Sequence, residues 1–378
     1  MQTVYFPNLG WSFDLNPVAF SIGNLTFRWY GVLIAIGFLL ALLYAFSRIK
    51  EFGLDSDRAI DVILAGTIGS IIGARAYYVI FQWSEFKDDP VSIFEIWNGG
   101  LAIYGGLIGA FLVGGLFCKL RKVKILPMFD LVCSALLIGQ CIGRWGNFIN
   151  VEAFGCNTTL PWGMTSASIK NYLAEHQAAL EAIGMTIDPS LPVHPTFLYE
   201  SLWSLIGFIL IALYIKHRRF DGEIMLIYSG WYGLGRMFIE GLRTDSLMIG
   251  TLRVSQVLAG LLFVASLITW IVVRSRIKAQ HDPEYLKLYA LTDEGKEVIA
   301  GTYYKRLEEE RKAAKAAKKA EKEAAAETAE SEETETETAE TGAETAGSEE
   351  SAAETAEETS GEDEPEADKE EKEEKTEE

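Results

Sequence analysis

Thirteen consecutive residues near the middle of the chain gather an arginine, two asparagines and a glutamate directly after a long apolar run. They read Gly143-Arg144-Trp145-Gly146-Asn147-Phe148-Ile149-Asn150-Val151-Glu152-Ala153-Phe154-Gly155. Polar side chains at the end of such a run are costly to place beside hydrocarbon, so they generally have a function there. Arginine suits phosphate, because its planar fork holds two oxygens and stays charged when partly desolvated. The segment therefore predicts an anion site at the edge of a membrane.

Three further polar clusters flank other apolar runs. They are His194-Pro195-Thr196-Phe197-Leu198-Tyr199-Glu200-Ser201, the set Tyr232, Arg236, Glu240 and Arg243, and Arg28-Trp29-Tyr30-Gly31. Spacings of four and three place the charges of the second cluster along one helical face. The first could simply be a capped helix start, and the third an aromatic interface belt with a snorkelling arginine. Together with Arg144 they favour an anion site at the level of lipid phosphates and chemistry at a phospholipid headgroup, where fixed donors stabilise the departing phosphate.

Two more polar residues fall inside apolar runs. Arg75 would pair with a carboxylate or line an internal cavity, and the sequence leaves both possibilities open. Tyr104 interrupts a glycine-rich run in which Gly105 and Gly109 are four residues apart. Small residues at this spacing let two helix backbones approach closely, so helix packing explains the glycines.

Seven apolar stretches could position these clusters. They run over Phe27–Phe46, Ile60–Trp83, Gly99–Phe117, Ile125–Gly143, Phe197–Tyr214, Ile224–Phe238 and Leu252–Val273. Most approach the ~20 residues that cross a bilayer core, so the sequence predicts an all-α integral membrane protein with a bundle of seven transmembrane helices. The sixth stretch holds only about two thirds of that length and could be tilted, broken or extended.

Positive charge predicts the orientation of this bundle. If the N-terminus is outside, the inner segments carry thirteen lysines and arginines, and the outer segments carry four, which are Lys87, Lys170, Arg243 and Arg253. Because cytoplasmic loops are enriched in these residues, we expect the N-terminus outside and the C-terminus in the cytoplasm. The first 25 residues have neither a basic start nor an apolar core, so no cleavable signal is expected.

The acidity of the chain is concentrated in its tail. The sequence has 53 acidic and 34 basic residues, of which 26 acidic and 4 basic residues lie from Glu321 onward, leaving 27 and 30 before it. Such a tail cannot bury enough apolar surface to fold. We expect a catalytic domain over 1–280 with an outer loop at about 150–196, a basic, alanine-rich juxtamembrane segment over 281–320, and a disordered acidic cytoplasmic tail over 321–378. A solvated helix is expected over about 306–326.

The cysteines and histidines do not suggest a metal site. Three of the four cysteines lie in or next to predicted helices, and the four histidines are scattered over both sides of the predicted membrane. No ligand spacing typical of a metal site is present, and we expect no metal.

The segment from Gly143 to Gly155 resembles the signature of the prolipoprotein diacylglyceryl transferases. The segments 28–31, 99–109, 194–200 and 236–243 match that family's other motifs in order, and the resemblance covers about residues 20–275. It implies a seven-helix enzyme of the bacterial cytoplasmic membrane. This enzyme would move the diacylglyceryl group of phosphatidylglycerol onto the lipobox cysteine of a preprolipoprotein and release glycerol 1-phosphate. Neither a cofactor nor nucleic acid is implied.

The resemblance also implies which residues form the site. The catalytic residues would be Arg144, Arg236, Tyr30, Tyr104 and Glu152. The lipid would be bound by Arg144, Asn147, Asn150, Gly155, His194, Tyr199, Glu200, Glu240 and Arg243. Arg144 and Arg236 are the leading phosphate-binding residues.

The chain departs from the family pattern at two positions. Tyr104 stands where a histidine is expected, so a base at that position is missing, and the tyrosine is expected to hydrogen-bond the lipid or the thiol. Phe197 stands where glutamine is expected. His194 is not expected to replace the missing base, because its place beside Pro195 also suits a loop anchor.

Other classes of membrane protein fit the sequence less well. A transporter would also bury arginines and carboxylates, but internal repeats and polar breaks near the midplane are not visible. A non-catalytic scaffold would not need the clustered outer charges. A different phospholipid headgroup enzyme is the closest alternative, and the identity of the acceptor would distinguish it.

Overall fold

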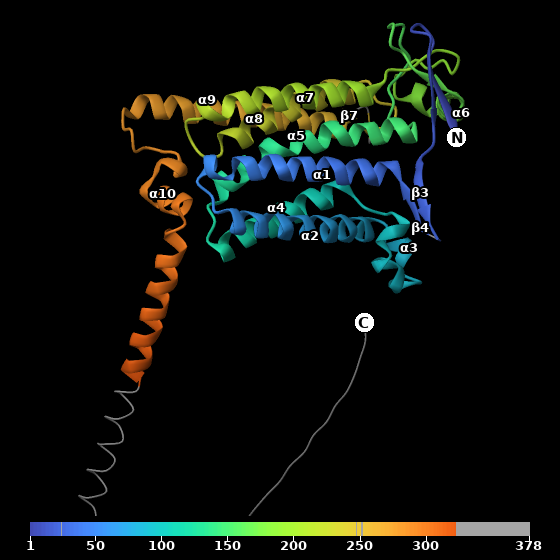
Figure 1. Ribbon diagram of the computed structural model, residues 1–378. Coiled ribbons are helices and arrows are strands. Elements are labelled where there is room, and N and C mark those ends of the chain that lie inside the picture. Colours follow the sequence, from blue (N-terminus) through green and yellow to red (C-terminus); the bar gives the residue numbers. More distant parts are fainter. Residues whose placement is uncertain (24, 247, 251, 323–378) are drawn as a thin grey trace, which may run out of the picture. The chain divides into compact units, whose positions relative to one another are not determined.

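Seven long helices dominate the fold, because an apolar segment in lipid must satisfy its own backbone hydrogen bonds. The computed structural model describes residues 1–23, 25–246, 248–250 and 252–322, and within them the seven helices run along one another (Figure 1). They are α1 (Trp29–Arg48), α2 (Ser56–Phe81), α4 (Ile103–Arg121), α5 (Ile125–Asn150), α7 (Thr196–Tyr214), α8 (Glu223–Glu240) and α9 (Val254–Gln280). All coincide with the predicted apolar stretches, with shifted boundaries.

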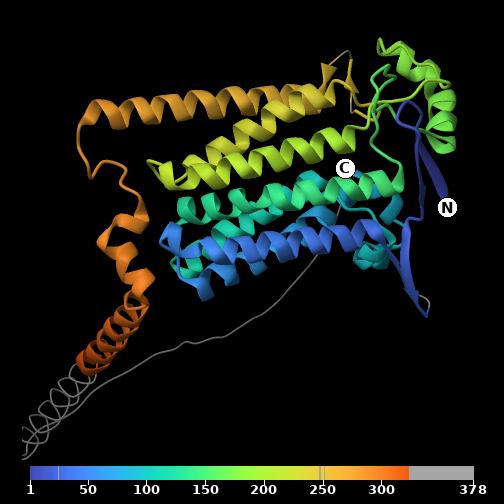
Figure 2. The same cartoon turned by 45° about the horizontal axis from the view of Figure 1, so that its top comes forward.

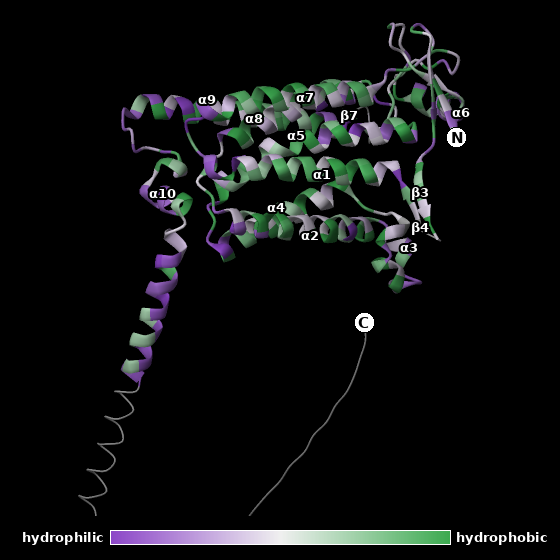
Figure 3. Ribbon diagram, viewed as in Figure 1, coloured by the Kyte–Doolittle hydropathy of each residue, from purple (hydrophilic) through white to green (hydrophobic). Residues whose placement is uncertain are grey.

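Six of these helices are long and apolar enough to cross a membrane, so the chain is a mostly helical integral membrane protein. The exception is α8, whose 18 residues include Glu223, Arg236 and Glu240. Figure 3 shows the apolar residues spread along α1, α2, α7 and α9. In α9 only 11% of the most apolar window is buried inside the protein. A surface of this kind is stable against lipid and prone to association in water.

The helices form two groups with α5 between them. α2 packs on α4, while α5 contacts α1 on one side and α7 on the other, and α8 packs on α9 (Figure 2). Glycines explain the first pair, as predicted: a Cβ on Gly105 would lie 2.3 Å from the carbonyl oxygen of Gly73, and one on Gly109 would lie 2.1 Å from that of Gly69. Only glycine permits backbones this close.

The structure is mostly helical, as expected, and short strands that the sequence did not predict join the helices at one end. β1 (Gln2–Phe6), β2 (Trp11–Leu15) and β5 (Thr165–Ser166) form one antiparallel sheet, β3 (Val18–Ile22) pairs with β4 (Leu25–Arg28), and β6 (Met248–Ile249) pairs with β7 (Leu252–Arg253). Phe27 and Arg28 therefore belong to a strand, and the first long helix begins at Trp29. These strands have two to five residues, too few for hydrophobic periodicity to reveal them.

The predicted outer loop is partly folded. It contains α6 (Ala167–Ala182), whose Ile169 and Leu173 are fully buried in one cluster with Val4 of β1. This cluster ties the N-terminal sheet to the segment that follows α5.

Arg75 contacts backbone carbonyl groups. It lies in α2 and is 8% exposed, and its guanidinium donates hydrogen bonds of 2.6–2.9 Å to the carbonyl oxygens of Ser92, Ile93, Gly99 and Gly100. These carbonyls belong to the connection between α2 and α4, which contains α3 (Trp83–Phe86), η2 (Pro90–Phe94) and η3 (Ile96–Asn98). Arg75 therefore organises an irregular loop by satisfying its backbone acceptors.

The end of the bundle away from the strands is built from short turns. They are η1 (Ile49–Phe52), η4 (Ile215–His217), η5 (Tyr289–Leu291) and α10 (Asp293–Ala300). The backbone N–H of Tyr289 donates to Asp221, and Lys124 pairs with Glu294 at 3.2 Å, so the segment after α9 is attached to the loops at this end of the bundle.

The remaining described residues form a second unit from Glu308, with residues 303–322 helical. The predicted acidic tail lies outside the described residues, except for its first two positions. Within the described part of the chain, no group of three or more His, Cys, Asp or Glu side chains is placed to hold a metal ion.

Candidate active site

Glu200 is the centre of an ion-pair cluster at the strand-bearing end of the bundle. Its Oε2 lies 2.6 Å from Nη2 of Arg144, and its Oε1 lies 3.0 Å from Nη1 of Arg243 and 3.5 Å from Nη1 of Arg236. The four residues come from α5, α7, α8 and the segment after α8. One carboxylate thus holds three guanidinium groups together, and Glu200 is only 7% exposed.

Arg243 is fixed most firmly of the three arginines. Its Nε and Nη2 donate to both carboxylate oxygens of Asp245, at 3.0 and 2.7 Å, in a fork-to-fork pair. Burial favours the neutral form of this group, but Asp245 and Glu200 outweigh burial and raise the pKa of Arg243 above its ordinary value. Arg243 is therefore a permanent positive charge.

Arg236 and Glu240 form a second pair on α8. Nη2 of Arg236 lies 2.6 Å from Oε2 of Glu240, although the angle is not that of a hydrogen bond. Glu240 is 1% exposed, and among the described residues this Oε2 accepts no hydrogen bond. The guanidinium of Arg253 donates to the carbonyl oxygens of Glu240 and Arg243. The cluster therefore has four guanidinium groups, three carboxylates and one buried oxygen that a ligand could satisfy.

Two tryptophans bring α7 and α8 together at the required distance. The indoles of Trp203 and Trp231 stack at 4.3 Å, and each Nε1 donates to the other residue's carbonyl oxygen, at 3.0 and 2.9 Å. A Cβ on Gly207 or Gly235 would lie 2.2 Å from one of these rings. The sequence thus places an indole on each helix against a glycine on the other, and this fixes Glu200 opposite Arg236.

Ser201 joins α7 to α5. Its hydroxyl donates to the carbonyl oxygen of Cys141 at 2.9 Å and accepts from Nε1 of Trp145 at 3.1 Å. Because Ser201 follows Glu200 and Trp145 follows Arg144, these bonds also set the position of the Arg144–Glu200 pair.

Gly155 lies where three segments cross. Its N–H donates to the carbonyl oxygen of His194 at 2.9 Å, and it forms a β-bridge with Arg243. An added Cβ would lie 2.8 Å from Cβ of His194 and 3.1 Å from the carbonyl oxygen of Leu242. A side chain at Gly155 would therefore push away the backbone that carries Arg243.

Glu152 belongs to a separate polar group at the end of α5. Its Oε1 accepts from Nδ2 of Asn147 at 2.8 Å and from Nδ2 of Asn150 at 3.2 Å. Val151 has a φ of +53°, an unusual conformation for a β-branched residue, and the chain turns back at this point. Among the described residues, Oδ1 of Asn150 is a second buried oxygen that accepts no hydrogen bond.

Tyr30 and Tyr104 lie at the same end of the bundle in different surroundings. The ring of Tyr30 packs on α5, where a Cβ on Gly146 would lie 2.6 Å from it. The hydroxyl of Tyr104, at the start of α4, is 3.2 Å from Oγ of Ser255 at the start of α9. The hydrogen bond of Tyr104 thus goes to α9, and the structure does not place this residue in the arginine cluster.

His194 and Tyr199 form a third group. Nδ1 of His194 is 3.0 Å from the hydroxyl of Tyr199, which also accepts from Nε1 of Trp162 at 2.6 Å. Burial lowers the pKa of His194 below its ordinary value, so the imidazole is neutral at pH 7. Phe197, which replaces an expected glutamine, stacks on Phe148 at 4.5 Å and is 5% exposed. It has a packing role in this protein.

Comparison with known families shows to which family the chain belongs. The model of a family described as prolipoprotein diacylglyceryl transferase matches residues 17–272. The chain belongs to this family. Relatives named phosphatidylglycerol-prolipoprotein diacylglyceryl transferase occur in Limosilactobacillus reuteri, with 45% identity over 71% of this chain and 95% of the relative, and in Listeria welshimeri, with 42% identity over 72% and 94%. Another from Staphylococcus aureus is 40% identical over 73% and 95%.

In this member of the prolipoprotein diacylglyceryl transferase family, the structure brings together five of the predicted site residues. Several residues that were not predicted lie beside them. Arg144, Glu200, Arg236, Glu240 and Arg243 form the cluster. A cavity of about 30 Å³ beside it is also lined by Gln140, Trp203, Ser204, Tyr232, Gly235 and Ile239. Gln140 could have been found, because an amide inside an apolar helix needs a reason. Asp245 gave no such signal, since it lies in polar loop sequence, and Arg253, at the start of the seventh apolar stretch, was counted only as an outer positive charge.

Proposed function

We propose that this protein transfers the diacylglyceryl group of phosphatidylglycerol to the lipobox cysteine of preprolipoproteins, the first step of bacterial lipoprotein maturation. Family membership and the names of the relatives support the reaction. The single structural observation that carries the proposal is the meeting of three guanidinium groups at Glu200. This cluster is suited to an anionic headgroup, because arginines held by fixed partners need no reorganisation when a phosphate arrives.

The proposal includes seven spans, with α8 as the seventh, in the bacterial cytoplasmic membrane. The segments that connect the spans carry thirteen lysines and arginines on one side and four on the other, which supports an outer N-terminus and a cytoplasmic C-terminus. The domain over 1–280 would then hold an active site at the outer leaflet, with the segments 281–320 and 321–378 in the cytoplasm. Its partners would be phosphatidylglycerol, other membrane lipid and lipobox signal peptides, with no nucleic acid and no cofactor.

In this reaction the cysteine sulfur attacks the carbon of the diacylglyceryl group that is bonded to the phosphodiester oxygen. A carbon–sulfur bond forms, the carbon–oxygen bond breaks, and its electron pair leaves with the phosphate as glycerol 1-phosphate. Arg144, Arg236 and Arg243 would bind the phosphate and offset its growing negative charge. Glu200 would hold the three side chains in place before the lipid arrives.

The thiol must lose its proton for this attack. A cysteine near its ordinary pKa of ~8.5 is only a few per cent thiolate at neutral pH. The positive field of the arginines favours the thiolate and would be its main activator. His194 would anchor a loop through Tyr199, and Tyr104 would hydrogen-bond lipid or peptide where α4 meets α9.

The glycerol end of the headgroup would be held by hydrogen bonds. Oε2 of Glu240 and Oδ1 of Asn150 are buried acceptors without hydrogen bonds among the described residues, and hydroxyl groups would satisfy them. Glu152 would orient Asn147 and Asn150, and Tyr30 and Gly155 would shape the walls.

Transfer of radiolabelled glyceride from phosphatidylglycerol to a lipobox peptide tests the proposal. Purified wild-type protein should label the cysteine peptide and leave a peptide with serine at that position unlabelled. Arg144→Ala should lower the rate at least about a hundredfold, because a donor to the departing phosphate is lost. Arg276→Ala removes the same charge from the other end of the bundle and should leave the rate unchanged. Absence of label with folded wild-type protein would contradict the proposal and favour a different headgroup enzyme.

A further inference from the structure

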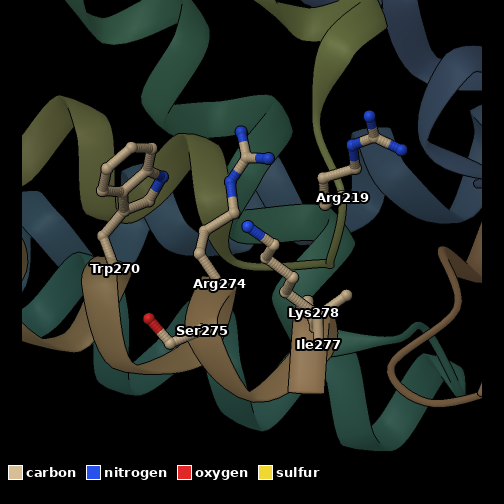
Figure 4. A pocket seen from close by; sticks show the side chains of 6 residues that line it. All are labelled: Arg219, Trp270, Arg274, Ser275, Ile277 and Lys278. Atoms are coloured by element: carbon tan, nitrogen blue, oxygen red, sulfur yellow. The ribbon is translucent and has the colours of Figure 1, made fainter. Parts of the chain in front are cut away.

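A second charged cleft lies at the opposite end of the bundle from Glu200. It is lined by Arg219, Trp270, Arg274, Ser275, Ile277 and Lys278 and has a volume of about 610 Å³ (Figure 4). Ligand pockets typically have ~300–1,000 Å³, so a phospholipid headgroup is within range. The site proposed for the transfer reaction does not use any of these residues.

The basic side chains of the cleft line the same space. Trp270, Arg274 and Lys278 follow one another at intervals of four on α9, so they share a helical face. Figure 4 shows Arg274 and Lys278 extending from this helix on the side where Arg219 stands, on the segment after α7. Three cations from two elements therefore line one cleft.

The charge in the cleft is only partly balanced. Nε of Arg274 is 2.8 Å from the fully buried carboxylate of Glu223, which also accepts from Nε1 of Trp270 at 2.8 Å. In the described part of the chain, no hydrogen bond or ion pair involves the side chain of Arg219 or Lys278, and both residues are exposed. Two positive charges thus remain for a ligand.

An apolar groove shares one lining residue, Trp270, with this cleft. It has a volume of about 230 Å³ and lies between α8 and α9, and its lining includes Leu226, Gly230, Phe263, Leu267 and Trp270. Trp270 lines both spaces, so a molecule with a charged head and an apolar chain could occupy them together. Free phosphate would leave the groove unused.

We infer that the cleft and groove together bind one anionic phospholipid, with its phosphate at Arg219 and Lys278 and an acyl chain between α8 and α9. The orientation proposed above places this lipid in the cytoplasmic leaflet. Anionic lipids of that leaflet attract basic residues next to membrane helices, and tryptophan is favoured at the interface. The lipid is a bound companion of the helices and takes no part in the transfer reaction.

Native mass spectrometry of the full-length protein, titrated with phosphatidylglycerol, phosphatidylcholine or inorganic phosphate, tests this inference. The variant Arg219→Gln/Lys278→Gln should bind phosphatidylglycerol at this site about thirtyfold more weakly, since each basic residue contributes roughly a factor of five. Lys216→Gln/Arg276→Gln removes equal charge from the same two elements outside the cleft and should change binding less than about threefold. Both variants keep Arg144, so binding at the outer site cancels in the comparison.

A second variant distinguishes the contribution of the acyl chain to binding from that of the headgroup. Gly230→Leu fills the groove and leaves every charge in place, and the new Cβ meets only ordinary contacts, with Cβ of Ser266 at 3.7 Å and Phe263 at 4.0 Å. Binding should weaken, while peptide transfer, which reports folding, stays normal. Equal binding of phosphatidylcholine, unchanged binding in the double variant, or displacement of lipid by inorganic phosphate would each overturn the inference.

Discussion

Two buried glutamates at opposite ends of the bundle show the difference between an open and a closed polar cluster. Glu223, at the end away from the strands, is fully buried and accepts hydrogen bonds from Tyr214, Trp270, Arg274 and the backbone N–H of Arg219. One arginine balances its charge. Glu200, at the strand-bearing end, faces three guanidinium groups.

The two clusters differ in how many charges and hydrogen-bonding groups around the carboxylate remain without a partner. Both oxygens of Glu223 accept hydrogen bonds, and three of the four donors are neutral. The Glu223 carboxylate therefore has no surplus of positive charge around it that would bind an anion. Around Glu200, four guanidinium groups meet three carboxylates, so one positive charge is left over; Oε2 of Glu240 pairs with Arg236 at 2.6 Å and accepts no hydrogen bond among the described residues. A saturated buried cluster supports folding, whereas an unsaturated one is expensive unless a ligand completes it.

Arg274→Ala should have the largest effect on stability. It removes the charge partner of a fully buried carboxylate, and breaking a buried pair in this way costs about 3 kcal/mol. The apparent Tm of detergent-solubilised protein should fall, while the transfer rate per folded molecule stays near that of the wild type. Arg276→Ala, two residues further along α9, serves as the control and should leave both values unchanged. A normal Tm in Arg274→Ala would show that the Arg274–Glu223 pair does not stabilise the fold.

Arg236→Lys should have the opposite profile. The charge at Glu200 and Glu240 is kept, so the Tm should stay close to that of the wild type, but the planar fork is lost. We expect kcat to fall about a hundredfold, because a lysine cannot hold two phosphate oxygens in the same geometry. Arg219→Lys makes the same change in the other cleft and should leave kcat intact. Equal kcat values for the two variants would show that the outer arginines act only through charge.

The sequence predicts the helices and several site residues, but it does not predict which charged side chains pair with one another. The apolar runs located the seven long helices, and for six of them the reason is that about twenty apolar residues have few alternatives to a membrane helix. The thirteen-residue segment located Arg144 and its neighbours. Glu200 as the common partner was not predictable, because its contact with Arg243, 43 residues away, depends on the interlocked indoles of Trp203 and Trp231.

Other contacts were not predictable for similar physical reasons. The acceptors of Arg75 are carbonyls of an irregular loop whose shape no periodicity encodes. The strands β1 and β2 were missed because short strands depend on tertiary partners, here the α6 segment behind Val4. The contact between the hydroxyl of Tyr104 and Ser255 on α9 joins residues 151 positions apart, and no spacing in the sequence reveals it.

Gly155→Ala should weaken the outer cluster without removing any charge. The new Cβ would lie 2.8 Å from that of His194 and 3.1 Å from the carbonyl oxygen of Leu242, so the segment carrying Arg243 must shift. Such overpacking costs about 1–3 kcal/mol, and we expect transfer to fall roughly tenfold as Arg243 moves away from Glu200. Gly139→Ala on α5, whose nearest neighbour would be 4.0 Å away, is the matched control. Normal transfer in Gly155→Ala would mean that the position of Arg243 matters little.

His194→Ala should have the smallest effect on the reaction and a measurable one on acid stability. The partly buried imidazole protonates more readily when the protein is unfolded, since burial lowers the pKa of His194 in the folded protein. The unfolded state therefore binds more protons below about pH 6.5, and stability falls as the pH drops from there through the folded pKa. His194→Ala should reduce this loss, and transfer should stay within about threefold of the wild type with the same pH profile, because the arginine field activates the thiol. Tyr199→Phe removes the hydrogen-bond partner and keeps the titrating group, so it should retain the acid sensitivity. A pH–rate profile that loses its acidic limb only in His194→Ala would instead make this histidine the base and reduce the role of the arginines to binding phosphate.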